Sequence, residues 1–124
     1  MGKVVGIGGV FFRARDPEAL AAWYARHLGI ATRPPPWFQD AGPTVFEPFP
    51  ADSDYFPADR AFMLNFRVAD LSALMAELQA AGIEVETRAE WDSSIGRFAR
   101  IADPEGNPIE LWEPAAPDDG GAAA

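Results

Sequence analysis

The chain has 124 residues, of which 48% are hydrophobic, so it can bury one core of ordinary domain size. Its formal net charge of −9 argues against nucleic acid and anionic membranes as partners, because both require a basic surface. It has no cysteine, which excludes disulfides, thiol catalysis and cysteine zinc sites. No apolar run approaches the roughly 20 residues that span a bilayer, and the first residues do not resemble a signal peptide, so we expect a cytoplasmic protein.

The first half of the chain predicts a strand, a helix and further strands. Residues 4–15 are rich in β-branched and aromatic side chains, as strands are. Asp16 is a good N-cap and Gly29 suits a helix end, so we expect a helix over residues 17–28. Two short segments after it again favour strands, residues 37–39 and 44–46.

The second half repeats this order. A strand is expected over residues 61–68, and Asp70 caps a helix that ends at Gly82. Three more strands are predicted, at residues 83–87, 96–101 and 108–112. The turn-forming run from Asp103 to Asn107 makes the last two strands a hairpin.

The two halves are copies of one unit. When Asp16 is aligned with Asp70, Phe12 falls on Phe66. The predicted fold class is therefore α+β, with two tandem βαβββ modules in one domain. The expected boundaries are residues 4–48 for module one, 49–60 for a linker and 61–114 for module two, which closes a domain of residues 1–114, and 115–124 for a disordered tail.

This pattern resembles the vicinal oxygen chelate superfamily, which includes glyoxalases, bleomycin-resistance proteins and extradiol dioxygenases. The resemblance covers residues 4–114. Its most specific parts are the run from Asp103 to Leu111 and the two strand–Asp–helix–Gly units. It implies a curved mixed sheet whose concave face is a cup for metal and substrate, with the helices on the convex face.

Enzymes of that superfamily hold a divalent metal at four strand positions, usually with His, Gln or Glu. The corresponding residues here are Gly9, Thr44, Met63 and Glu110. Glycine offers no side-chain ligand, a thioether is a poor ligand for these metals, and a threonine hydroxyl is weak. Because only Glu110 matches, we expect no conventional metal centre and no cofactor.

Alternation along the predicted strands assigns one face of each strand to the cup. The residues expected to bind a ligand there, or at its rim, are Phe11, Arg13, Trp37, Tyr55, Asn65, Arg67, Phe98, Arg100 and Trp112. Arginines suit an anionic group and aromatic side chains suit an apolar one, so a small aromatic or anionic compound is the expected partner.

Glu110 has two interpretations. A carboxylate buried in an aromatic cup can have a raised pKa and act as a general base. Alternatively, it forms a structural ion pair with Arg100 or Arg67. The one histidine, His27, is expected to lie at the surface near a helix end, and the glycines of residues 6–9 are not placed as a phosphate-binding loop.

Three functions remain open. The chain is a metal-independent protein that binds a small molecule, as resistance proteins do; or a lyase, isomerase or dioxygenase that uses Glu110 as base or metal ligand; or an interaction module whose sheet serves dimerisation. The first and third functions are compatible. We expect a homodimer, because the strands at the edges of a short sheet carry unpaired backbone groups that a second copy can cover.

Overall fold

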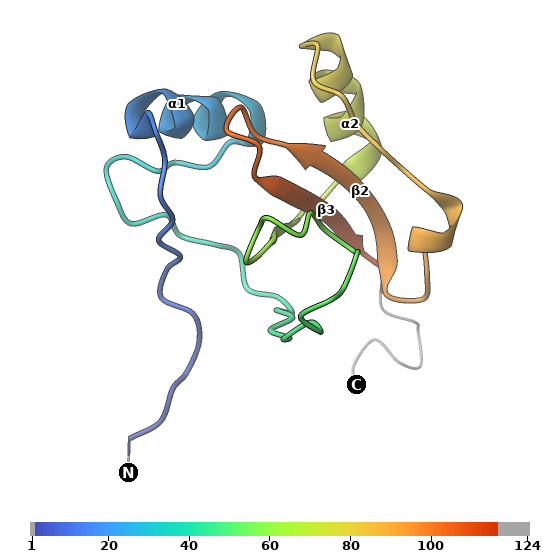
Figure 1. The fold of residues 1–124 in the computed structure, drawn as a ribbon, viewed down its shortest axis with the longest axis horizontal. Coiled ribbons are helices and arrows are strands. Elements are labelled where there is room, and N and C mark those ends of the chain that lie inside the picture. The colour runs from blue at the N-terminus through green and yellow to red at the C-terminus, as the bar shows by residue number, and fades with distance from the viewer. Residues whose placement is uncertain (1, 117–124) are drawn as a thin grey trace.

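The computed structural model describes residues 2–116. Two helices and a three-stranded sheet form an α+β fold (Figure 1). The elements in chain order are α1 (Pro17–Leu28), β1 (Leu64–Arg67), α2 (Leu71–Ala80), the short 3-10 helix η1 (Ala89–Trp91), β2 (Gly96–Ala102) and β3 (Pro108–Pro114).

Both helices begin at the predicted aspartates. The side chain of Asp16 accepts a hydrogen bond from the backbone N–H of Ala19, and Asp70 does the same for Ala73, at 3.1 Å in each case. Helix α1 ends at Gly29, whose φ of 68° is left-handed, as the sequence predicts. His27 lies in the last turn of α1.

The sheet has the strand order β1-β3-β2, with β1 parallel and β2 antiparallel to β3. In this register Glu110 of β3 lies between Asn65 of β1 and Arg100 of β2. The segment predicted as a strand over residues 83–87 follows the outer side of β2 but makes one isolated bridge, between Glu86 and Arg100.

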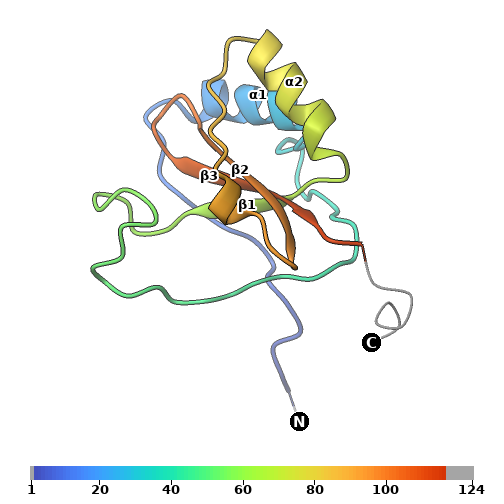
Figure 2. The ribbon, with the colours of Figure 1, turned by 90° about the vertical axis from the view of Figure 1, so that its right-hand side faces the viewer.

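The core lies between the helices and one face of this sheet, as Figure 2 shows with both helices above the strands. Alternate strand residues point into it, and Ala99, Ile109 and Leu111 have no exposed surface. The helices and the segment after α1 contribute Leu20, Tyr24, Ile30, Leu71 and Leu78. The opposite face of the sheet therefore carries the other strand residues.

The hairpin turn between β2 and β3 holds α1 in place. The carboxylate of Asp103 accepts hydrogen bonds from the N–H groups of Glu105 and Asn107, from the Asn107 amide and from the buried Tyr24 hydroxyl, the last at 2.7 Å. The carboxylate of Glu105 accepts from the N–H groups at the start of α1, those of Arg15 and Asp16. The turn thus has a structural role that links the two halves.

The strands predicted in the first half are not formed. In the part of the chain that the structure describes, residues 2–16 and 29–63 contain no strand. Most of their large apolar side chains are exposed, by 98% for Phe11 and 85% for Phe38, although Phe12 and Ile30 reach the core. A strand needs a neighbouring strand for its backbone hydrogen bonds, and these segments have none. The tandem modules and the cup stay predictions, and residues 117–124 of the predicted tail lie outside the described residues.

Candidate functional site

The sheet face opposite the helices carries a buried carboxylate, that of Glu110 on β3, which is 8% exposed. Its Oε1 accepts a hydrogen bond of 2.7 Å from the Asn65 amide, and its Oε2 accepts a short one from the Tyr55 hydroxyl. The ion pair expected as one alternative is not present: within residues 2–116, no salt bridge joins Glu110 to Arg100 or Arg67. Two neutral donors satisfy the carboxylate instead.

Arg100 lies beside Glu110 and is enclosed by aromatic rings. Its guanidinium carbon lies 4.9 Å from the centre of the Tyr55 ring and 5.3 Å from that of Trp91. Its Nη2 donates to the Tyr55 carbonyl at 2.9 Å, while its Nε has no hydrogen-bond partner among the described residues. That Nε is buried, and within residues 2–116 no salt bridge neutralises the charge of Arg100.

The Tyr55 hydroxyl is held in its protonated form. Burial raises its pKa, and the hydrogen bond and charge of Glu110 raise it further, while Arg100 lowers it. Because the net shift is upward, the hydroxyl remains a donor to Glu110 at neutral pH.

An aromatic pair continues this face toward the end of β3. The rings of Phe98 and Trp112 are parallel, with an angle of 1° between their planes and 6.1 Å between their centres. The indole N–H of Trp112 donates to the carbonyl of Ile95 at 2.8 Å, which fixes the ring. Trp112 is 6% exposed, so the half-buried ring of Phe98 is the more accessible part of this aromatic pair beside Glu110.

The structure brings Tyr55, Asn65, Phe98, Arg100 and Trp112 of the predicted site onto one face with Glu110. The other predicted site residues take no part in these contacts. The Arg67 guanidinium donates to the carbonyl of Asp40 at 2.9 Å, and Trp37 packs on Phe66, a core-side residue. Phe11 and Arg13 are exposed, because the strand that was to carry them is not paired.

Trp91, on η1, was missed by sequence reasoning. It lies outside the predicted strands, and no local pattern indicates that its ring covers Arg100.

The residues at the superfamily's metal positions do not fit a divalent metal. Both oxygens of Glu110 are already bound by side-chain donors, and Gly9, Thr44 and Met63 supply no strong ligand. Across residues 2–116, no three His, Cys, Asp or Glu side chains are grouped in a way that could hold an ion. The chemistry of this face is therefore that of hydrogen bonds, one cation and aromatic surface.

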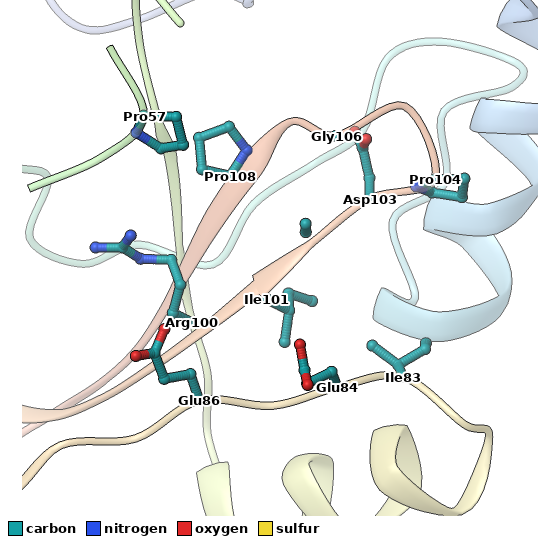
Figure 3. Close-up of a pocket in the computed structure, with 11 residues that line it drawn as sticks. Pro57, Ile83, Glu84, Glu86, Arg100, Ile101, Asp103, Pro104, Gly106 and Pro108 are labelled. Carbon is teal, nitrogen blue, oxygen red and sulfur yellow. The ribbon is translucent and has the colours of Figure 1, made fainter. Parts of the chain in front are cut away.

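A pocket of about 410 Å³ opens at the outer edge of β2, below the hairpin turn (Figure 3). It shares Arg100 with the face just described, and its other walls include Pro57, Glu84, Glu86 and Ile101. Glu86 is already paired with Arg88 at 2.8 Å. Glu110 and the aromatic pair are not in its walls, so we place the candidate site on the sheet face and not in this pocket.

The sequence profile of the glyoxalase-like domain matches residues 9–112. The chain belongs to this glyoxalase-like family. Among solved structures, it is similar to TnmS3, an antibiotic binding protein from Streptomyces sp. CB03234, with 26% identity and a TM-score of 0.56 over 90% of this chain and 100% of that one. A glyoxalase/bleomycin resistance protein from the same organism is 36% identical, but the match covers 40% of this chain and 42% of that chain, with a TM-score of 0.36. No curated protein matches this glyoxalase-like chain.

The family match over residues 9–112 confirms the resemblance that the sequence indicates. Within the described residues, no helix has the length and apolar character needed to cross a membrane.

Proposed function

We propose that this glyoxalase-like protein binds a small aromatic or anionic compound on the sheet face that carries Glu110, without a conventional metal centre. The observation that carries the proposal is the Arg100 guanidinium, a cation that lies beside the rings of Tyr55 and Trp91 and forms no salt bridge among the described residues. A guanidinium in such surroundings suits a carboxylate or sulfonate, and the half-buried ring of Phe98, which lies parallel to that of the buried Trp112, suits a flat apolar group. The likeness to an antibiotic binding protein supports the same class of function.

The test is a titration of the full chain with naphthalene-2-sulfonate, a flat aromatic anion, followed by tryptophan fluorescence. We expect Arg100→Gln to weaken binding at least tenfold, about 1.4 kcal/mol. Arg97→Gln is the matched control, because Arg97 lies on the same strand but is exposed and donates to Ser72 of α2. Titration with 2-naphthol, which lacks the anionic group, separates the aromatic from the anionic contribution. Equal affinities of both variants and the parent chain would contradict the proposed site.

The metal-free part of the proposal has its own test. Purified protein is dialysed against several divalent ions, freed of excess and analysed by mass spectrometry for bound metal. We expect no stoichiometric retention, because Glu110 is the one strong ligand at the four positions. One equivalent of metal that disappears in Glu110→Gln would contradict this.

The alternative function is that of a lyase, isomerase or dioxygenase in which Glu110 acts as base. The observation that favours it is the buried carboxylate with an adjacent proton donor, Tyr55. Under this alternative, Glu110→Gln abolishes conversion of a bound compound and leaves its affinity nearly unchanged. Under the binding function, no conversion is seen in either protein.

In this proposal the protein works as a homodimer. Ten of the twelve large hydrophobic side chains that are exposed among the described residues lie within residues 4–49. Monomeric proteins rarely leave so large an apolar surface in water.

A further inference from the structure

Residues 49–56, called the Tyr55 segment below, lie on the side of the sheet away from the helices (Figures 1 and 2). The segment has an aromatic cluster of its own, in which the centre of the Phe49 ring lies 5.6 Å from that of Tyr55 and 5.7 Å from that of Phe56. Within residues 2–116, neither phenylalanine packs against the hydrophobic core. A segment that is packed by its own side chains, with few contacts to the core, can move as a unit.

Tyr55 fastens this segment to the sheet. Its hydroxyl donates to Oε2 of Glu110, and its carbonyl accepts from Nη2 of Arg100 at 2.9 Å. In the described part of the chain, these are the only hydrogen bonds between residues 49–56 and the rest of the protein. Both partners belong to the candidate site, so the attachment of the segment and the occupation of the site involve the same contacts.

The contacts of Tyr55 are those that a bound molecule would make. Its phenol donates to the buried carboxylate, its carbonyl accepts from the guanidinium, and its ring lies beside that guanidinium, 4.9 Å from the carbon to the ring centre. The Asn65 amide already donates to the other oxygen of Glu110. A ligand that uses Glu110 and Arg100 therefore competes with Tyr55 for them.

We propose that the ligand displaces Tyr55 and takes over its three contacts, and that the ligand is a hydroxyaryl compound with an anionic group. This inference deepens the proposed function and rests on it. The phenol of the ligand replaces the donor that Glu110 loses, and a carboxylate binds a guanidinium more strongly than the neutral carbonyl of Tyr55 does.

The hydroxyl of the ligand determines specificity. When Tyr55 leaves, Oε2 of Glu110 has no side-chain donor, and a buried carboxylate oxygen without a partner is costly. A site of this kind discriminates strongly against an analogue that lacks the hydroxyl, because the protein group then stays unpaired.

The probes for the first experiment follow from Tyr55 itself. Phloretate is a tyrosine without its amino group, so it carries the ring, the hydroxyl and the carbonyl carbon at the spacing found in Tyr55. Hydrocinnamate lacks only the hydroxyl. In isothermal titration calorimetry of the full chain, we expect hydrocinnamate to bind at least tenfold more weakly than phloretate. Equal affinities would overturn the assignment of a hydroxyaryl ligand.

The second experiment separates displacement of Tyr55 from a role as a fixed wall of the site. We expect Tyr55→Phe to bind phloretate at least tenfold more tightly than the parent chain, because the competing hydroxyl is gone. If Tyr55 stayed in place and contacted the ligand, the same substitution would weaken binding or leave it unchanged, and either result overturns displacement. Tyr24→Phe is the matched control, since it removes the hydroxyl of the other tyrosine, which donates to Asp103, and should leave the affinity unchanged. Circular dichroism checks that each variant folds.

The third experiment measures the movement and does not depend on the stability of Tyr55→Phe. The chain has no cysteine, so a nitroxide label can be attached at Asp54→Cys in the segment and, as a control, at Ser94→Cys outside it. Both positions are exposed. We expect phloretate to make the label at Asp54→Cys more mobile in its electron paramagnetic resonance spectrum and to leave the other label unchanged.

The outcomes distinguish this inference from the proposed function. Saturation with phloretate and an unchanged spectrum at Asp54→Cys would mean that Tyr55 is not displaced, which overturns the inference and leaves the proposed binding function in place. If neither phloretate nor naphthalene-2-sulfonate binds to the parent chain, the proposed function itself is contradicted, and the inference with it.

Discussion

At the scale of the residue, the Tyr55 hydroxyl provides one of the two side-chain hydrogen bonds that stabilise the buried carboxylate of Glu110. In Tyr55→Phe this carboxylate oxygen loses its donor, so we expect the free energy of unfolding to fall by about 1–3 kcal/mol. Urea denaturation measures the change. Tyr55→Phe, Glu110→Gln and the variant that carries both substitutions form a double-mutant cycle. If the two single changes in the free energy of unfolding add up to that of the double variant, the two side chains do not interact.

Tyr24 gives stability a dependence on alkaline pH. Burial, with the Asp103 hydrogen bond and charge, raises the pKa of Tyr24 far above its ordinary value of about 10. The contribution of Tyr24 to the free energy of unfolding is complete below pH ~10. It is lost as the pH rises further, because the unfolded chain then releases a proton that the native state retains. We expect Tyr24→Phe to reduce this loss by up to about 1.4 kcal/mol per pH unit. Urea denaturation between pH ~9 and ~11 measures it, and equal slopes for variant and parent chain would contradict the assignment.

At the scale of the element, the hairpin turn depends on Gly106. Its φ is 83°, and an added Cβ would lie 2.8 Å from Nη2 of Arg60, which itself donates to the Glu105 carbonyl. We expect Gly106→Ala to lower the free energy of unfolding by more than about 1 kcal/mol, because both the backbone and the contact are strained. Gly2→Ala is the control, since nothing lies within 4 Å of a Cβ there. Equal stability of both variants would show that the turn tolerates a side chain.

The same elements show which parts of the fold can be predicted from sequence. The start of each helix and the end of α1 are predicted correctly because their signals are local: Asp16 and Asp70 bind N–H groups three residues on, and Gly29 adopts the left-handed conformation. The strands of the first half are not formed, although their composition is right. A strand depends on a distant partner that residue composition does not specify.

The site follows the same division. Alternation correctly separates Glu110 and Trp112 from the core residues Ile109 and Leu111, because strand period is a local property. The ring of Trp91 over Arg100 has no local signal, since it comes from a separate short helix. Nor did the sequence reveal that neutral donors, and not an arginine, satisfy Glu110.

At the scale of the whole molecule, the proposed homodimer would make folding depend on protein concentration. Any equilibrium in which native chains associate and unfolded chains do not stabilises the native state by mass action. We therefore expect the midpoint of thermal unfolding to rise when the protein concentration is raised a hundredfold, as calorimetry at several concentrations would measure. In Phe11→Asp, which places a charge where an apolar ring is 98% exposed in the single chain, the midpoint should depend less on concentration. A parent chain whose midpoint does not move over that range would be a monomer, which would contradict the proposed homodimer.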